Sequence, residues 1–372
     1  MKNYEDVQNI SFAGKIKNSL VGALIGVILF FCAVVILWVN EAQYAKKIEI
    51  AKFIRTNVIN VNAANISKLN NGKLIHTSDY ARTSETLSDN IVNIPLAISL
   101  IRNVEMYQWK EIKRTKTENL GGGKSRKYTE YIYNNVWSKE LINSDNFVHK
   151  ELHENPAGFP IETTRINAKN VNLGAYKLSE EEIAKLDNTS KLMGLPYNDK
   201  YRIYNGFYFS GLDFDSPSIG DIKISYHTIF SNTPVSIIAK QNGRKLEPYK
   251  TKNFTIDIIE EGTKSSDDMI NDFLNSNTIR ANLFRFAGFI MILFALRLFS
   301  APLIEISNYY LLLGKIVDYI TGIASFIIAI GISGFIISLA WIIYRPEIAI
   351  PALILSLCLI FFFPRKKHLT ID

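Results

Sequence analysis

The sequence predicts a membrane protein with an α+β extramembrane domain, made of two strand-rich halves, inserted between transmembrane helix 1 and a C-terminal bundle of three transmembrane helices. Apolar residues gather in blocks near both ends of the 372-residue chain, and the stretch between them alternates as β-strands do. The 22 Phe and 18 Tyr residues exclude a disordered chain, and the two cysteines exclude a disulfide scaffold. A net charge of +7 gives no reason to expect nucleic acid as a partner.

The first apolar block, residues 20–39, is predicted to be transmembrane helix 1. It contains no charged residue, and about 20 helical residues cross a hydrocarbon core of roughly 30 Å. A cleaved signal peptide usually has an apolar region of only about 7–15 residues. Because this run is longer and is followed by Asn40 and Glu41, we expect a retained anchor; a signal peptide is the alternative.

Three further spans are predicted near the end of the sequence. Residues 319–344 are uncharged and long enough to span with some tilt, and residues 346–363 form another apolar run after a polar turn. Residues 283–302 are less clear, because only 11 residues separate Arg285 from Arg297. Both arginines can snorkel to opposite headgroup layers, which favours a span; a helix lying in the interface is the alternative.

The four spans put both tails on one side of the membrane and residues 42–280 on the other. Cationic residues in the tails, residues 1–19 and 364–372, favour a cytoplasmic position for both. The extramembrane domain, with a first half at 42–165 and a second half at 166–280, is then expected in the lumen or periplasm.

The first half is predicted to contain a long hairpin. Residues 91–109 and 128–137 are strand-like, and the second run alternates, with one face formed by Thr129, Tyr131, Tyr133 and Trp137. Residues 110–127 carry seven basic and two acidic residues and are predicted to be the hairpin tip. A solvated tip is the default interpretation; contact with lipid headgroups or with an acidic partner is the alternative.

The second half is predicted to follow a short helix that Ser179 and Glu182 begin as a capping box. Asn242-Gly243 predicts a tight hairpin turn. Strands are expected at residues 201–209, 222–229 and 234–240. Two longer helices are expected next to the membrane, at residues 41–58 and 267–277.

No catalytic, cofactor-binding or metal site is predicted. Residues 121–125 (GGGKS) resemble the end of a phosphate-binding loop, but Glu118 stands where the motif needs glycine, and the segment lies between strands. His149 and His153 have the spacing of zinc ligands on a helix. No further ligand is placed nearby, and Asn155-Pro156 would end such a helix.

Two polar or small-residue features mark the third span. Gly331, Gly334 and Ser338 suit close helix packing. Asp318 lies one turn after Lys315, so we expect the two to form an interfacial ion pair; a polar pathway is the alternative.

The motif Val104-Glu105-Met106-Tyr107-Gln108-Trp109 resembles a signature of the transmembrane protein 43 family. Further matching residues follow in the same order along nearly the whole chain. They include Tyr133-Asn134, Trp137, Ile142-Asn143-Ser144, Asn146-Phe147, His153, Asn155-Pro156, Gly220-Asp221, Ile238-Ala239-Lys240-Gln241, Gly243, Leu246, Pro248 and Tyr344-Arg345-Pro346, with Asn40-Glu41 after the first span.

This resemblance implies a multi-pass membrane protein for which no enzymatic activity is established. In animals, the family is associated with the endoplasmic reticulum and inner nuclear membrane, where it is thought to self-associate and to organise membrane complexes with lamins and emerin. A bacterial member would lie in the cytoplasmic membrane. The basic charge of residues 110–127 is not part of this resemblance.

Our leading hypothesis is a non-enzymatic membrane protein, without cofactors, that scaffolds or organises membrane complexes. Its expected partners are the lipid bilayer, further copies of itself and unidentified membrane proteins. The candidate core or interaction face consists of Tyr107, Trp109, Tyr131, Tyr133 and Trp137. One alternative is a channel or transporter subunit with a regulatory extramembrane domain; another is a lumenal or periplasmic enzyme with convergent ionisable residues in a deep pocket.

Overall fold

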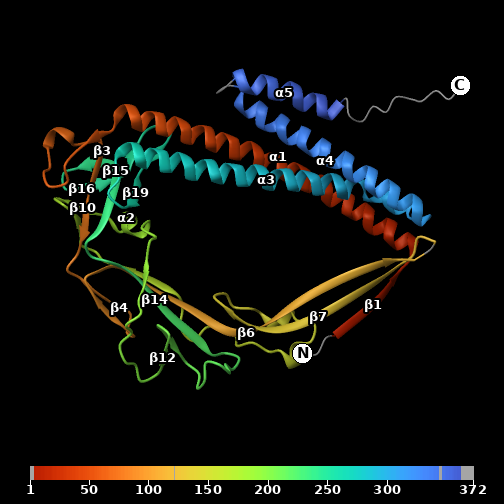
Figure 1. Ribbon diagram of the computed structural model, residues 1–372, viewed down its shortest axis with the longest axis horizontal. Helices are drawn as coiled ribbons and strands as arrows, with labels where there is room; N and C mark the ends of the chain where they lie inside the picture. The colour runs from red at the N-terminus through yellow and green to blue at the C-terminus, as the bar shows by residue number, and fades with distance from the viewer. Residues whose placement is uncertain (1–3, 121, 343–345, 362–372) are drawn as a thin grey trace. The chain divides into compact units, whose positions relative to one another are not determined.

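The computed structural model describes residues 4–120, 122–342 and 346–361 (Figure 1). They form two compact units. The strand-rich unit contains Lys52–Lys113 and Tyr131–Asp272, and the helical unit contains Glu5–Ala51, Arg114–Glu130 and the chain from Phe273 onward. An apolar helix, then strands, then apolar helices follow one another along the chain, which confirms the predicted fold class. The polar turn at Arg345 and the tail 364–372 lie outside the described residues.

Two large sheets contain most of the strands. The eight-stranded sheet has the order β1-β7-β6-β14-β13-β12, with β8 paired to β6 and β11 to β14. Its strands are β1 (Tyr4–Ile10), β6 (Ala97–Asn119), β7 (Ser125–Ser138), β8 (Thr164–Asn167), β11 (Ser190–Lys191), β12 (Arg202–Tyr204), β13 (Phe207–Phe209) and β14 (Ile222–Phe230).

The seven-stranded sheet has the order β19-β15-β16-β10-β9-β3-β2, with an additional pairing of β15 to β3. Its strands are β2 (Ile59–Asn60), β3 (Leu74–Arg82), β9 (Val171–Leu173), β10 (Tyr176–Leu178), β15 (Thr233–Asn242), β16 (Lys245–Glu247) and β19 (Ile258–Glu261). Two small hairpins pair β4 (Thr86–Ser88) with β5 (Asn93–Pro95), and β17 (Tyr249–Lys250) with β18 (Thr255–Ile256). Short 3-10 turns lie at Lys68–Asn70, Ser144–Asn146 and Lys150–Leu152.

Each large sheet takes strands from both predicted halves of the domain. Strand β6 pairs antiparallel with β14 through register partners such as Val104 and Ile224. Strand β3 pairs antiparallel with β15, with Thr77 opposite Ile237. Apolar side chains on the inner faces of these long strands are fully buried and form one core. The two halves of the sequence therefore share a core and fold together.

The predicted hairpin tip at residues 110–127 is wrong in its extent. Strand β6 continues to Asn119 and β7 begins at Ser125, with the turn closed by the Leu120 N–H donating to the Lys124 carbonyl at 2.8 Å. Residues 113–119 are exposed on both faces, so no core imposes alternating hydrophobicity there. Backbone pairing extends the strands where the side-chain pattern gives no signal.

Local turn and cap signals are confirmed. Asn242-Gly243 lies at the connection of β15 to β16, where Gly243 has φ +59°. Ser179 and Glu182 form a complete capping box at the start of α2 (Glu180–Ala184). The helices expected at 41–58 and 267–277 are continuous with spans, as parts of α1 (Phe12–Asn57) and α3 (Ser266–Ser307).

In the helical unit, α1, α3 and α4 (Leu311–Trp341) are long and apolar enough to cross a membrane. The last helix, α5 (Pro346–Phe361), has 16 residues, or about 24 Å of helix. Figure 1 shows α1 alongside α3 and α4 alongside α5. Helices α1 and α3 approach closely at Gly288, where a Cβ atom would stand 2.5 Å from the Leu37 side chain. The described part of the chain therefore has three helices of spanning length, and the fourth span remains a prediction.

Candidate functional sites

One group of the aromatic residues singled out from the sequence packs around His153. The Tyr133 ring stacks on the imidazole at 3.7 Å between centroids, and the Trp109 ring meets it edge-on at 4.7 Å. Asn155 accepts from the backbone N–H of Trp109 at 2.7 Å and donates to its carbonyl at 2.9 Å. Tyr131 and Tyr133 are only 9% and 4% exposed, so this group has the packing of a core.

The second group surrounds Trp137 and reaches the surface of the strand-rich unit. The ring of Tyr107 lies 5.2 Å from that of Trp137, and the ring of Phe214 stacks on it at 5.9 Å. The ammonium group of Lys223 lies 5.0 Å from the Trp137 ring centroid, within the range of a cation–π contact. Tyr204 stacks on Phe214 at 4.6 Å and is 39% exposed. This group therefore opens to the solvent through Tyr204.

The sequence did not single out the exposed apolar side chains next to this group. Met193, Ile203 and Leu212 are 63%, 45% and 82% exposed. A Cβ atom at Gly206, in the turn after β12, would stand 2.9 Å from the Met193 sulfur, and Arg202 of β12 donates to the Leu212 carbonyl. Met193 and Leu212 therefore lie next to β12, an edge strand of the eight-stranded sheet among the described residues, and Ile203 and Tyr204 point to opposite faces of that strand. We call Met193, Ile203, Tyr204 and Leu212 the β12 patch.

A buried ion pair borders a cavity of about 770 Å³ in the strand-rich unit. Asp89 accepts from Arg102 Nη1 at 2.8 Å and from the Tyr226 hydroxyl at 2.6 Å. The Asp89 side chain is 2% exposed. Burial and the bond to Asp89 raise the pKa of Tyr226, so its hydroxyl remains a hydrogen-bond donor. The pair neutralises itself and fixes the β4–β5 turn against β6 and β14.

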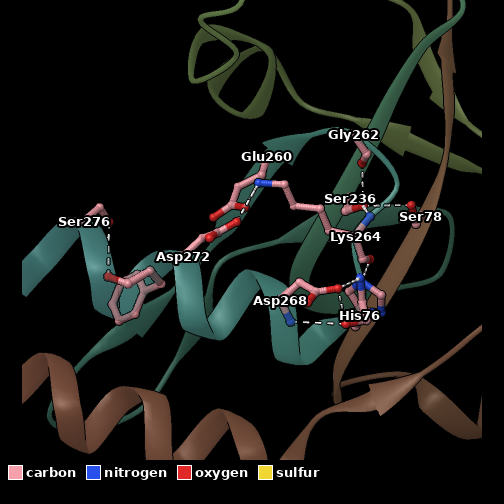
Figure 2. Close-up of polar contacts among 11 residues, drawn as sticks. His76, Ser78, Ser236, Glu260, Gly262, Lys264, Asp268, Asp272 and Ser276 are labelled. Atoms are coloured by element: carbon pink, nitrogen blue, oxygen red, sulfur yellow. Dashed lines mark hydrogen bonds and ion pairs between the residues drawn. The ribbon is translucent and has the colours of Figure 1, made fainter.

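Polar contacts fix the junction at which β19 leads into α3 (Figure 2). Lys264 Nζ donates to Asp272 and to Glu260, at 2.8 Å each, and these bonds raise the pKa of Lys264 to about 12. His76 Nε2 lies 3.0 Å from the Lys264 carbonyl, and burial lowers the pKa of His76. The imidazole is therefore neutral at pH 7, and Nε2–H donates to that carbonyl. These groups are occupied in anchoring the helix start.

A second buried carboxylate lies in the helical unit, where it ties three helices together. Glu41 of α1 accepts from Arg285 of α3 at 2.7 and 2.6 Å, and from Trp341 Nε1 of α4 at 2.6 Å. The Glu41 side chain is fully buried. One turn further along α1, the Tyr44 hydroxyl lies 2.8 Å from that of Thr278. Charges inside a bundle are costly unless paired, and this carboxylate receives two donors from an arginine.

A cavity of about 310 Å³ adjoins this network, between α1, α3, α4 and α5. Its polar wall is formed by Arg285, Tyr44, Ser338 and Trp341, and its apolar wall by Ile48, Ile337, Ile348, Ala349 and Ala352. The guanidinium of Arg285 is already bound to Glu41, so the cavity has no uncompensated charge from this pair.

Two more ion pairs join helices within the same unit. Lys15 of α1 bonds to Glu305 of α3 at 2.6 Å. Asp318 pairs with Arg297 across α3 and α4, so the expected pairing with Lys315 is wrong. Lys315 is nearer to Asp318 in sequence and lies one turn away on the same helix. Arg297, however, bonds both to the Asp318 carboxylate and to the Asp318 carbonyl, and this double contact favours the pairing between helices.

The small residues of the third predicted span face α5. A Cβ atom at Gly331 would stand 2.8 Å from Ile360, and one at Gly334 would stand 2.5 Å from the Ser356 hydroxyl. Ser338 is buried and borders the cavity described above. These residues therefore lie at a helix contact within the chain.

Among the described residues, neither the His149–His153 pair nor the glycine-rich segment at residues 121–125 forms a metal or phosphate site. His149 and His153 flank a 3-10 turn, and His153 Nδ1 lies 2.9 Å from the His149 carbonyl. Within the described ranges, no cluster of three metal-ligating residues is found. Gly122, Gly123 and Lys124 lie in the turn between β6 and β7, as expected for a hairpin, and Gly121 lies outside the described residues.

Sequence reasoning missed Glu41 as a helix-joining residue, although a signal was present. Leu37, Glu41 and Ala45 follow at intervals of four, so all three lie on one face of a helix, and all three are buried. An acidic residue within such an apolar stripe needs a buried partner. Arg285 flanks another span, but the sequence alone does not reveal that the two helix faces meet.

Comparisons with known proteins place these features in a family. The family model described as Transmembrane protein 43 matches residues 106–346. Human and mouse Transmembrane protein 43 are each 28% identical over 351 residues, covering 90% of this chain and 87% of theirs. The Transmembrane protein 43 homolog of Drosophila melanogaster is 26% identical over 339 residues, covering 88% of this chain and 89% of its own. No solved structure matches. The chain therefore belongs to the transmembrane protein 43 family.

Proposed function

We propose that this chain is a non-enzymatic multi-pass membrane protein that self-associates and organises membrane protein complexes. The observation that carries this proposal is that the ion pairs of the helical unit lie between helices. Glu41 with Arg285, Lys15 with Glu305, and Asp318 with Arg297 each join two helices. A channel or transporter needs polar groups along a water-accessible path. Charges that hold helices to one another favour a fixed platform over such a path.

The β12 patch supports binding to a protein partner outside the membrane. Its four apolar side chains are 39–82% exposed and flank β12, which lies at the edge of the eight-stranded sheet; exposed apolar side chains beside a free strand edge favour a protein partner. Tyr204 stacks on Phe214, which in turn stacks on Trp137, so the Trp137 group fixes the Tyr204 side of the patch. We therefore assign partner binding to the β12 patch, and a packing role to Tyr131 and Tyr133.

Self-association needs a surface other than Gly331 and Gly334, because both contact α5. We assign it to the outward stripe of α1 that consists of Leu24, Ile28, Phe31 and Val35. These side chains are 60–68% exposed, and their spacing of four, three and four residues is that of a helix–helix seam. The chain would work as an integral protein of the endoplasmic reticulum or inner nuclear membrane in a eukaryote, or of the cytoplasmic membrane in a bacterium.

Two differently tagged full-length copies, expressed together and solubilised in mild detergent, test this function. We expect one tag to recover the other. Replacing the four α1 residues with Ala should abolish this recovery. The same replacement of Leu312, Ile316, Tyr319 and Ile323 on α4, which are also exposed, is the matched control and should leave recovery intact. If the purification recovers only the copy whose tag is used, with neither the second copy nor any other protein bound reproducibly, the chain is not a scaffold.

A further inference from the structure

The cavity of about 310 Å³ in the helical unit has no role in the function proposed above. Tyr44 and Trp341 border it, and their rings meet edge-on at 5.7 Å. Tyrosine and tryptophan near the ends of spans mark the boundary between lipid headgroups and hydrocarbon. In the expected four-span topology, the end of α4 and the start of α5 lie on the same side of the membrane as Tyr44. All walls of the cavity therefore lie in one leaflet.

One side of the cavity is polar, and it contains a buried hydroxyl group without a partner. Ser338 of α4 borders the cavity and is only 4% exposed. No residue in the described part of the chain forms a hydrogen bond with the Ser338 hydroxyl. A hydroxyl group that is removed from water without a hydrogen bond is unfavourable. The cavity therefore presents a donor and an acceptor that a bound molecule would satisfy.

Arg285 and Tyr44 add hydrogen-bonding groups to the same polar side. Arg285 donates to Glu41 at 2.7 and 2.6 Å and to Asn282 at 2.7 Å. Each terminal guanidinium nitrogen carries a second N–H group, which has no acceptor among the described residues. The Tyr44 hydroxyl donates to Thr278 Oγ1 at 2.8 Å, because the Thr278 hydroxyl already donates to a backbone carbonyl. The oxygen of Tyr44 is thus available to accept.

The charge of the cavity favours a neutral ligand. Among the described residues that line it, Arg285 alone carries a charge, and the buried carboxylate of Glu41 neutralises that charge. A phosphate group placed in the cavity would lack a counter-charge, and burying an unpaired charge is costly. The ligand is therefore expected to have oxygen atoms but no net charge.

The other side of the cavity is apolar, with Ile48, Ile337 and Ala352 among its residues. Ile348 also lines the cavity and is 60% exposed, so the cavity opens beside Ile348 at the outer surface of the bundle. Its volume equals that of roughly ten molecules of liquid water. This space holds a small polar group and the first part of a hydrocarbon chain, and the rest of such a chain would continue into the bilayer.

We propose that this cavity binds a neutral acylglycerol, with the glycerol group at Ser338 and Arg285 and the acyl chain against Ile337 and Ile348. An ester carbonyl only accepts hydrogen bonds, which suits the N–H groups of Arg285. Glycerol hydroxyls donate and accept, which suits Ser338 and Tyr44. A sterol has a single hydroxyl and would leave part of this polar side unsatisfied. Water satisfies the polar side but leaves the apolar side without contacts.

Photolabelling of the full-length protein in phosphatidylcholine nanodiscs tests the proposal. The probe is a monoacylglycerol with a diazirine in its acyl chain and a terminal alkyne for detection. After irradiation and digestion, we expect the label on the parts of α4 and α5 that contain Ile337 and Ile348. An excess of unlabelled monooleoylglycerol should prevent this labelling. Lysophosphatidic acid, which adds a phosphate to the same acylglycerol, should compete at least about tenfold more weakly, because the phosphate would lack a counter-charge. Cholesterol should also compete more weakly.

Three results of the competition would overturn the proposal. Equal competition by lysophosphatidic acid would show that the cavity accepts a charged headgroup. Equal competition by cholesterol would show that it selects a sterol-like shape and not the glycerol group. Labelling that is spread over the exposed faces of the helices and resists competition would show contact with bulk lipid only.

Ser338→Ala tests the polar side of the cavity. Loss of one hydrogen bond should weaken binding of monooleoylglycerol in the competition assay by roughly three- to tenfold. Ser333→Ala is the matched control, because Ser333 is also a buried serine of α4 without a hydrogen-bond partner among the described residues, but it does not line the cavity. The control should bind as the parent protein does. Equal binding by both variants would overturn the assignment of Ser338.

Ala352→Phe tests the apolar side, because the larger side chain should fill the cavity and abolish the competable label. Leu355→Phe is its control, since Leu355 of the same helix is 63% exposed and does not line the cavity. Thermal unfolding in detergent identifies a variant that does not fold, and the smaller change Ser338→Ala then decides the result. Full labelling of a folded Ala352→Phe variant would overturn the proposal. The α1 stripe assigned to self-association does not border the cavity, so recovery of tagged copies and lipid binding can fail independently.

Discussion

Asp89 of the strand-rich unit and Glu41 of the helical unit are both buried carboxylates, and an arginine neutralises each of them. Each carboxylate is at most 2% exposed, and each accepts from an arginine and from an aromatic donor, Tyr226 or Trp341. The difference lies in where the partners come from. Arg102 is 13 residues from Asp89, whereas Arg285 is 244 residues from Glu41.

This difference shows what each pair does. Asp89 also accepts from the backbone N–H groups of Ile91 and Val92, at 3.1 Å each, so it shapes a local turn on which the cavity is built. Glu41 receives its donors from α3 and α4 and joins three helices. The helical unit therefore depends on its buried carboxylate more than the strand-rich unit does, because a large apolar core also holds the strands.

The largest effect is expected from Arg285→Leu. Removing the guanidinium leaves the buried Glu41 carboxylate with the neutral donors Trp341 and Asn40 and without a counter-charge, and breaking a buried pair in this way costs about 3–5 kcal/mol. Thermal unfolding of the full-length protein in detergent should move to a clearly lower temperature. Arg280→Leu is the control, because Arg280 lies over the Phe284 ring at the exposed side of α3. Equal stability of the two variants would show that Glu41 is not a helix-joining group.

Glu182 sharpens the comparison, because it is a buried carboxylate without an arginine. Burial, with a smaller contribution from the charge of Asp257, raises the pKa of Glu182 from 4.5 to about 7. One carboxylate oxygen accepts from the Ser179 N–H at 2.7 Å, and the other is buried without a partner among the described residues. The folded state thus holds a proton more tightly than the unfolded state does.

The stability contributed by protonated Glu182 is complete below pH 4.5 and is lost as the pH rises through about 7. Glu182→Gln removes this loss and keeps an acceptor for the Ser179 N–H. We expect the variant to be more stable than the parent at pH 8, by up to about 3 kcal/mol, with little difference at pH 4.5. Denaturation at both pH values measures this, with the exposed neighbour Glu181→Gln as control. A gain that is equal at both pH values would contradict the assignment.

Arg102→Leu should cost less than Arg285→Leu. Asp89 would keep the Tyr226 hydroxyl and two backbone N–H groups, so we expect a loss of about 2 kcal/mol. Hydrogen exchange of the Ile91 and Val92 amides should speed up locally, because Asp89 orders that turn. A loss larger than that of Arg285→Leu would reverse the comparison between the units.

The smallest effect is expected from Asp318→Asn. The Asp318 and Arg297 side chains are 52% and 32% exposed, and exposed ion pairs contribute about 0–1 kcal/mol. Ion flux through vesicles that contain the variant should equal that of the parent protein. A changed flux would favour the channel or transporter alternative, since it would mean that this carboxylate borders a path.

The features that sequence could predict are those that depend on near neighbours. The apolar runs predicted the helices, the Ser179–Glu182 capping box predicted the start of α2, and Asn242-Gly243 predicted the β15–β16 turn. The candidate aromatic residues on β6 and β7 divide into two groups, Trp109 and Tyr133 around His153 and Tyr107 with Trp137, a division that the alternation within each strand does not reveal. The β6–β7 tip was misjudged in extent, since its polar residues have no covered face that would create a pattern.

The remaining features depend on which surfaces meet. Glu41 with Arg285, and Lys15 with Asn119, are contacts across 244 and 104 residues, and no periodicity within either segment specifies the other. Asp318 shows the same limit: Lys315 was the nearest cation in sequence, but Arg297 of a different helix is its partner.

A double-mutant cycle on Glu41 and Arg285 tests most directly whether charge in the helical unit holds helices together. Glu41→Gln, Arg285→Leu and the double variant are unfolded in detergent beside the parent protein. If the two groups stabilise each other, the double variant should lose less unfolding free energy than the two single variants lose together. We expect this difference, the coupling energy, to be about 2–3 kcal/mol. Strictly additive losses would mean that the two groups act separately, and the fixed platform on which the scaffold proposal rests would have no basis.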